Sequence, residues 1–182
     1  MARMRHWNPL TINPNMPQEP RVRFFNETGD CIPPFVDLSW RGCCLNRDRF
    51  DATMMPRFLF EAIMVATDSK EISVHFHAPE RPPAVDIASD WATFRAVTRR
   101  PVNQSLEHVL FDRSGRWAVL CELDVVVLGA SPEIAARIDN ELEQHGTSLE
   151  QMTAWDYPET RSADPRYSYM RAVVGRDPVG AP

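Results

Sequence analysis

Apolar and polar residues alternate most regularly between Glu71 and His77. Every second side chain in this segment is apolar, and the polar side chains between them include His75 and His77. A period of two places the apolar set on one face, so the segment predicts a half-buried β-strand. A weaker alternation predicts another strand over Arg21–Glu27.

Apolar residues recur with helical spacing in three other segments. They predict helices over Asp51–Asp68, Asp90–Arg99 and 132–145. Residue types that cap helices stand near the expected starts: Asp51 or Thr53, Ser89 and Ser131. Pro56 is expected in the first turn of the first helix, where proline is tolerated. The third helix carries one apolar stripe, formed by Ile134, Ile138 and Leu142.

The clearest unit of the chain lies just before the third helix. Strands are predicted over Leu106–Phe111 and Arg116–Glu122, joined by a tight turn at 112–115. A wholly apolar strand follows over Val125–Leu128, and we expect Gly129 to end it. The unit therefore reads as three strands followed by a helix. Its core is expected to contain Trp117, Val119 and Cys121.

The remaining segments are rich in proline or in polar residues. Residues 1–20 are expected to form an extended arm, 78–87 a loop, and 175–182 a frayed tail. A short helix is expected to start within Thr147–Met152, and a last strand is predicted over Tyr167–Val174.

The chain has 182 residues, of which 43% are hydrophobic and 25% are charged, as in folded globular proteins. No repeat or low-complexity linker divides it. We therefore predict a single α+β domain over 1–182, with an antiparallel sheet of about five to six strands and about two to four helices packed against it.

Charge and cysteine usage restrict the possible partners. The net charge is −5, and a chain without a concentrated basic patch is a poor ligand for nucleic acid. No apolar run is long enough to span a membrane, and no apolar core follows the basic residues at the start, so we expect no membrane partner and no secretory signal.

A disulfide between the adjacent Cys43 and Cys44 would be strained. Reduced thiols in a cytosolic protein are expected, with Cys43 and Cys44 as buried filler rather than a reactive pair.

One cluster could hold a metal. Strand alternation places His75 and His77 on the same face, and Glu80 follows as a possible third ligand. Two histidines facing solvent on a half-buried strand explain the same residues, and no metal or cofactor is predicted. A metal-dependent enzyme with a dispersed site around these three residues stays as the alternative function.

Acidic and aromatic residues gather late in the chain. A solvated surface explains such a cluster, and so does an acidic docking patch with aromatic anchors of the kind enriched at protein interfaces. On the second interpretation the partner-binding residues are Asp139, Glu143, Glu150, Trp155, Asp156, Tyr157 and Glu159. We predict no catalytic residues.

The unit at 106–145 resembles the core pattern of bacterial immunity proteins, which neutralise polymorphic or contact-dependent growth-inhibition toxins. The residues that carry the resemblance are Phe111-Asp112, Ser114-Gly115, Trp117, the strand to Leu128, Gly129 and the helix opening at Pro132-Glu133. The unit that contains them covers roughly a fifth of the chain.

The resemblance implies a small cytosolic binding protein rather than an enzyme. Such a protein binds the C-terminal domain of its cognate toxin, which can be a nuclease. It occludes the active site of the toxin, or it locks the toxin in an inactive shape. It implies no cofactor, and it leaves the oligomeric state open.

Overall fold

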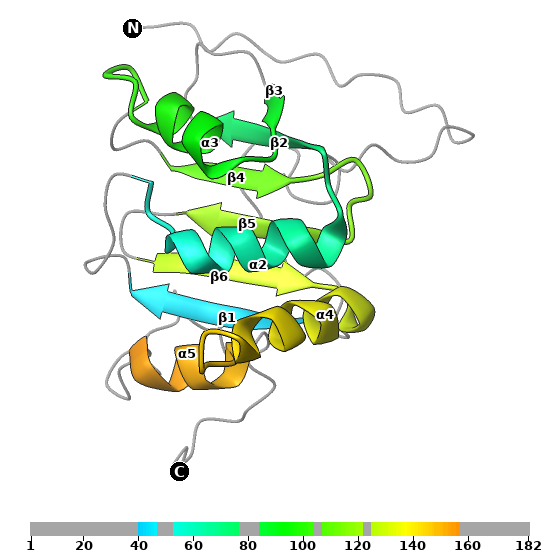
Figure 1. Ribbon diagram of the computed structural model, residues 1–182. Helices are drawn as coiled ribbons and strands as arrows, with labels where there is room; N and C mark the ends of the chain where they lie inside the picture. Colours follow the sequence, from blue (N-terminus) through cyan, green and yellow to red (C-terminus); the bar gives the residue numbers. More distant parts are fainter. Residues whose placement is uncertain (1–39, 47–52, 77–83, 104–106, 122–124, 157–182) are drawn as a thin grey trace, which may run out of the picture.

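The computed structural model describes residues 40–46, 53–76, 84–103, 107–121 and 125–156, which are coloured in Figure 1. Several predictions concern other parts of the chain and lie outside the described residues: the arm over 1–20, the strands over Arg21–Glu27 and Tyr167–Val174, and the tail over 175–182.

Within the described ranges, six strands form one sheet in which every neighbouring pair is antiparallel. In chain order they are β1 (Arg41–Asn46), β2 (Glu71–Phe76), β3 (Val85–Ala88), β4 (His108–Phe111), β5 (Trp117–Cys121) and β6 (Val125–Ala130). Their order across the sheet is β1-β6-β5-β4-β2-β3. The first described strand therefore pairs with the last.

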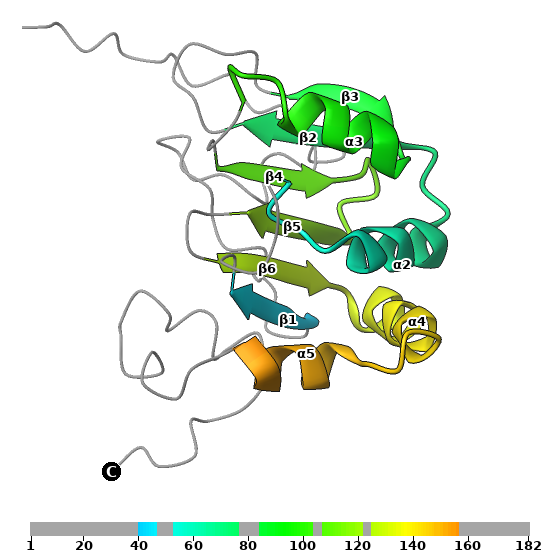
Figure 2. The same cartoon turned by 60° about the vertical axis from the view of Figure 1, so that its left-hand side comes forward.

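The described residues form four helices: α2 (Arg57–Thr67), α3 (Trp91–Thr98), α4 (Pro132–Glu143) and α5 (Leu149–Asp156). Figures 1 and 2 show α2, α3 and α4 over one face of the sheet, while α5 lies at the β1 edge. The predicted α+β class, an antiparallel sheet with helices packed against it, is confirmed.

The main core lies between the sheet and these helices. Leu110, Val119 and Leu128 form one row across β4, β5 and β6, and each is fully buried. They belong to the same apolar cluster as Ile63 of α2 and Ile138 of α4. Trp117, Val119 and Cys121 are all buried here, as the sequence predicts.

The central strands are also apolar on their other face. Val109, Leu120 and Val127 lie in register there and are buried, although none of the described helices covers this face (Figure 2). Strands buried on both faces need apolar residues at consecutive positions. This requirement explains the unbroken apolar runs of β5, of β6 and of Val109–Phe111 in β4.

Two predictions about strand ends are wrong. The segment 78–87 is not a loop throughout, because Val85–Ala88 forms β3 at the sheet edge. An edge strand is paired on one side only, so it tolerates the short length left after the prolines. Gly129 does not end β6, which continues to Ala130. Gly129 lies opposite Gly42 of β1, where the two strands approach closely.

The first helix begins later than predicted, at Arg57 rather than near Asp51. Pro56 precedes the helix and is not part of its first turn. Its backbone is extended, with a φ of −63° and a ψ of 137°. A residue that precedes proline is kept out of the helical region, so Met55 cannot extend the helix backwards.

One predicted cap is wrong, and a second is right in position but lacks the capping hydrogen bond. Asp90, not Ser89, caps α3, since its carboxylate accepts a hydrogen bond of 2.9 Å from the backbone N–H of Thr93. Ser131 occupies the capping position of α4, but its hydroxyl makes no capping hydrogen bond. Pro132 at the first helical position sets the helical φ without that bond.

Candidate functional site

The predicted partner-binding residues fall on α4 and α5. The buried stripe of α4 consists of Ile134, Ile138 and Leu142, each with 0% exposure. Because the stripe packs on the sheet side, the polar residues of α4 lie on its opposite side. Gly146 follows with a left-handed φ of 69° and turns the chain towards α5, as its predicted role as a helix stop requires.

Asp139 is used within the fold. It is half-buried, and its Oδ1 accepts a hydrogen bond of 2.7 Å from the backbone N–H of Leu149. Leu149 is the first residue of α5, whose opening N–H groups have no partner inside the helix. Asp139 therefore attaches the start of α5 to α4.

Glu143 and Glu150 are exposed to solvent. Among the described residues no basic side chain forms an ion pair with Glu143. The remaining acidic residues of α4 have local contacts: Glu133 with Arg116 at 3.4 Å, and Glu141 with Gln144 at 3.2 Å. Glu143 is thus the predicted site residue most available to a partner.

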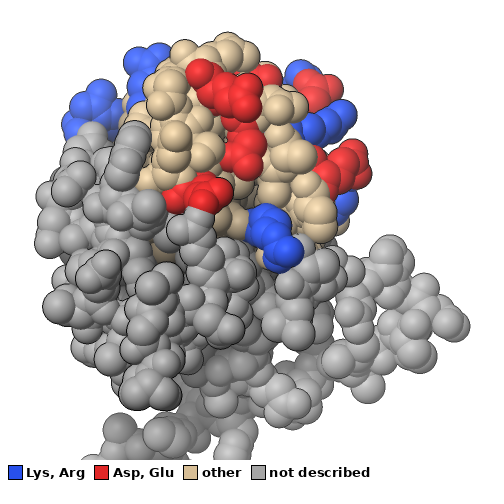
Figure 3. Space-filling model, turned by 90° about the horizontal axis from the view of Figure 1, so that it is seen from below, with Lys and Arg blue, Asp and Glu red and all other residues tan. Residues whose placement is uncertain are grey.

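Carboxylates dominate this side of the molecule. Residues 132–152 contain five carboxylates, one arginine and one histidine, namely Glu133, Asp139, Glu141, Glu143, Glu150, Arg137 and His145. Arg137 donates a hydrogen bond of 3.3 Å to the backbone carbonyl of Ala66 in α2. Figure 3 shows Asp and Glu side chains across the middle of the coloured surface, with Lys and Arg mainly towards its borders. We call the residues Glu133, Asp139, Glu141, Glu143 and Glu150 the acidic face.

The aromatic part of the predicted patch is described only in part. Trp155 and Asp156 are the last two residues of α5, whereas Tyr157 and Glu159 lie outside the described residues. The helix predicted to start within Thr147–Met152 is confirmed, and it continues to Asp156.

The alternative metal cluster is also described only in part. His75 lies on β2, half-buried, directly opposite Val109 of β4. Neighbouring Val74 and Phe76 point to the other face and are buried, so the predicted alternation of this strand is confirmed. His77 and Glu80 lie outside the described residues. Within the described ranges, no three His, Cys, Asp or Glu side chains come together as a metal site.

The sheet brings a cysteine and a histidine together that sequence reasoning did not connect. Cys121 of β5 lies directly opposite His108 of β4, and the two residues are 0% and 1% exposed. The imidazole packs between Phe76 and Phe94, with ring centroids 5.5 and 6.1 Å away. A nucleophile needs access to its substrate, so this enclosed pair belongs to the core. Cys43 and Cys44 are likewise buried thiols, in accord with the filler interpretation.

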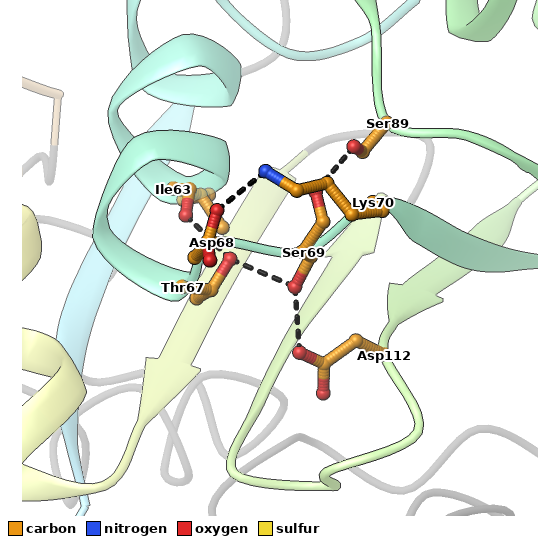
Figure 4. A network of polar contacts seen from close by, with 7 residues as sticks. All are labelled: Ile63, Thr67, Asp68, Ser69, Lys70, Ser89 and Asp112. Carbon is orange, nitrogen blue, oxygen red and sulfur yellow. Dashed lines mark hydrogen bonds and ion pairs between the residues drawn. The ribbon is translucent and has the colours of Figure 1, made fainter.

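A polar network holds together the end of the sheet near α2 (Figure 4). Asp112, in the turn between β4 and β5, accepts a hydrogen bond of 2.7 Å from Ser69 Oγ. Its other carboxylate oxygen accepts one of 2.9 Å from the backbone N–H of Ser114. Ser89 Oγ donates to the Ser69 carbonyl. The network joins three connections of the fold, so Asp112 acts as a structural residue.

None of the described helices is long and apolar enough to cross a membrane. Comparison with protein-family models, with characterised proteins and with solved structures finds no match to this chain.

Proposed function

We propose that this chain is an immunity protein of the cytosol, which binds the C-terminal domain of a cognate bacterial toxin and neutralises it. The observation that carries the proposal is the acidic face of α4 and α5. The partner surface that complements it is basic.

The segment that resembles immunity proteins supports the same proposal. It forms a continuous unit of β4, β5, β6 and α4. Trp117, the residue that marks the second strand of that pattern, lies fully buried in the core. The turn with Asp112, Ser114 and Gly115 is closed by a hydrogen bond of 3.1 Å from the Gly115 N–H to the Asp112 carbonyl. The residues of the resemblance thus have a common structural role, which is to build the scaffold that presents α4.

A nuclease toxin fits the acidic face best. A nuclease binds the phosphates of its substrate, so its active-site cleft is lined with basic side chains. An acidic surface of the inhibitor is attracted to such a cleft over distances of about 10 Å, which raises the association rate. Once bound, the surface covers the cleft, and substrate is excluded without any chemical step.

Growth rescue tests the proposal. The toxin probe is the C-terminal domain of the large toxin that we expect to be encoded directly upstream, expressed in a bacterial host with and without this chain. We expect the domain to stop growth alone, and growth to recover when the chain is co-expressed. The two proteins are also expected to elute together in size-exclusion chromatography. Growth arrest that persists in the presence of folded chain, together with separate elution, would refute the proposal.

Metal content separates this proposal from the alternative enzyme. A binding protein of this kind is expected to purify without stoichiometric zinc, iron or manganese, measured by inductively coupled plasma mass spectrometry. Bound metal that is lost on changing His75→Ala and His77→Ala would instead support a metal-dependent enzyme.

A further inference from the structure

Strand β3 forms the edge of the sheet opposite to β1. Among the described residues no strand pairs with its outer side, whereas α5 packs on β1 at the other edge (Figures 1 and 2). An edge strand presents backbone N–H and C=O groups that can pair with a further strand. Nothing in the proposed function uses this edge.

The hydrogen-bonding register of β2 and β3 shows which backbone groups point outwards. Glu71 lies opposite Ala88, so the next two residues, Lys70 and Ser89, also lie opposite each other. The N–H of Ser89 donates a hydrogen bond of 3.2 Å to the carbonyl of Lys70. Bonded and non-bonded pairs alternate along an antiparallel ladder. The pair of Glu71 and Ala88 is therefore a non-bonded one, and the N–H and C=O groups of Ala88 face away from β2.

The same alternation assigns the other residues of β3. Ile87 lies opposite Ile72 in a bonded pair, so its backbone groups are used inside the sheet. Asp86 comes next and faces outwards like Ala88. The side chains of Asp86 and Ala88 are exposed, so solvent reaches this edge. The outer side of β3 therefore offers the N–H donors and C=O acceptors of these two residues.

An apolar side chain lies beside these backbone groups. Val85, the first residue of β3, is 36% exposed. It alternates with Asp86 and so shares a face of the sheet with the buried Ile87. When a strand is added to a sheet edge, main-chain hydrogen bonds provide affinity and alternate side chains provide specificity. The β3 edge has both elements.

We propose that β3 pairs with β3 of a second copy of this chain, antiparallel and about a two-fold axis at Ile87. In this register Asp86 of each copy lies opposite Ala88 of the other. Both residues face outwards, so each such pair is a bonded one and exchanges both of its hydrogen bonds. All outward donors and acceptors of β3 are then used. The two six-stranded sheets become one continuous sheet.

The residue types of β3 select this register. An axis at Asp86 would place the two Asp86 side chains directly opposite each other, and like charges so placed destabilise a strand pair. An axis at Ala88 would leave the outward groups of Asp86 without a partner in β3. The axis at Ile87 avoids both faults, and it makes Val85 a diagonal neighbour of Ile87 of the second copy. The strand is thus complementary to itself, which favours a second copy over a different protein.

The proposed dimer leaves the acidic face uncovered. That face lies on α4 and α5, which pack against β1, whereas the dimer forms at β3 on the opposite edge of the sheet. Each copy keeps its own acidic face available to a partner. The inference does not rest on the proposed function, and either can fail without the other.

Sedimentation velocity of the full chain tests the inference. A strand of four residues forms a smaller contact than a permanent interface, so we expect a reversible dimer. The molar mass is expected to rise from that of one copy towards that of two between about 10 μM and 1 mM protein.

Hydrogen exchange locates the contact in the unaltered protein. The amides of Asp86 and Ala88 are expected to exchange at least about threefold more slowly at the high end of this concentration range than at the low end. The amide of Ile87 is the internal control. It is bonded within the sheet in both states, so its exchange should not depend on concentration.

Matched variants at one position separate backbone pairing from other causes. Ala88→Pro removes an N–H that the sheet does not use, so the single copy is expected to stay folded. The variant is expected to weaken dimerisation at least about tenfold, because both copies lose a donor. Ala88→Thr is the control, since it keeps the N–H and suits a strand. A thermal melt verifies that both variants are folded.

Several results would overturn the inference. One is the molar mass of a single copy at about 1 mM protein. Others are fast exchange of the Asp86 and Ala88 amides at every concentration, or equal dimerisation of Ala88→Pro and Ala88→Thr. Protection of the two amides that appears only when another protein is added would assign the edge to a different partner.

Discussion

Among the described residues, Trp117 is the largest side chain that is completely buried. It lies opposite Ala130 of β6, at the point where the sheet passes into α4. Its indole N–H has no acceptor among the described residues. The contribution of this residue is therefore one of volume and apolar surface rather than of hydrogen bonding.

Truncation of Trp117 tests this role. Trp117→Ala is expected to lower the free energy of unfolding by about 3–5 kcal/mol, because it leaves a large cavity in the core. Trp117→Phe keeps an aromatic ring and removes the indole N–H, so it should cost clearly less. Chemical denaturation measures both. Equal losses in the two variants would show that the N–H, and not the volume, matters.

Gly42 and Gly146 require glycine for two different physical reasons, a lack of space at Gly42 and a left-handed backbone at Gly146. A Cβ at Gly42 would lie 1.7 Å from the carbonyl oxygen of Leu128, which is backbone and cannot move aside. Gly146 has open space around it but a φ of 69°. We expect Gly42→Ala to cost about 3 kcal/mol or more, and Gly146→Ala about 1–2 kcal/mol from its left-handed conformation alone.

Thermal or chemical unfolding of the two glycine variants checks the order. A Gly42→Ala protein as stable as Gly146→Ala would mean that β1 and β6 can separate locally at little cost. In that case the edge strand would contribute less to the fold than its pairing indicates.

Helix α5 packs on β1, and its first residue is also held by a side chain of α4. It has eight residues, which is too short for an isolated helix to be stable in water. Leu149 and Met152 bury its inner side in the core. The bond from the Leu149 N–H to Asp139 fixes its first turn.

Asp139→Ala is expected to cost about 1 kcal/mol and to speed hydrogen exchange at the amides of 149–152. Asp139→Asn keeps an acceptor oxygen and should retain most of the protection. Glu143→Ala, on the exposed side of the same helix, serves as the control and should leave these amides unchanged. Fast exchange in the control variant as well would assign the effect to α4 as a whole.

The elements with a clear period were predictable from the sequence. The alternation in β2 and the apolar stripe of α4 reflect burial on one face, which is a local property of the pattern. In contrast, β1 (Arg41–Asn46) was not predicted, because apolar and polar residues do not alternate in its sequence RGCCLN. It forms by pairing with β6, about 80 residues away along the chain, and such long-range pairing leaves little local trace.

The candidate site was predictable only in outline. Negative charge late in the chain pointed to α4, and the exposed Glu143 lies there. The sequence could not show that Asp139 is used to hold α5, because the partner is a backbone N–H after a turn.

At the scale of the whole molecule, charge is separated along the layer of helices. The α3 end carries Arg95, Arg99 and Arg100, whereas α4 and the start of α5 carry the acidic face. Figure 1 shows α2 between these two regions. A protein with such a distribution orients itself in the field of a charged partner before contact.

The association rate with the upstream-encoded toxin domain tests this orientation. The double variant Glu143→Lys and Glu150→Lys is expected to associate more slowly, and to lose much of the salt dependence of the rate. Asp86→Lys reverses a charge on β3, at the opposite edge of the sheet, and should leave the rate almost unchanged. Stopped-flow measurements over a salt series provide both quantities. Equal rates for all three proteins would place the interface away from α4.

The order of the strands also determines when the protein can fold during its synthesis. The chain is made from β1 towards β6, yet in the finished sheet β1 is paired only with β6 among the described strands. About 80 residues separate the two strands, which corresponds to about 4–16 s of translation at 5–20 residues per second. During that interval β1 has no partner among the described strands, and the sheet can grow only from β2, β3, β4 and β5. The sheet of the described strands is therefore completed by the return of the first strand to the last, so a nascent chain that stalls before Ala130 cannot complete it.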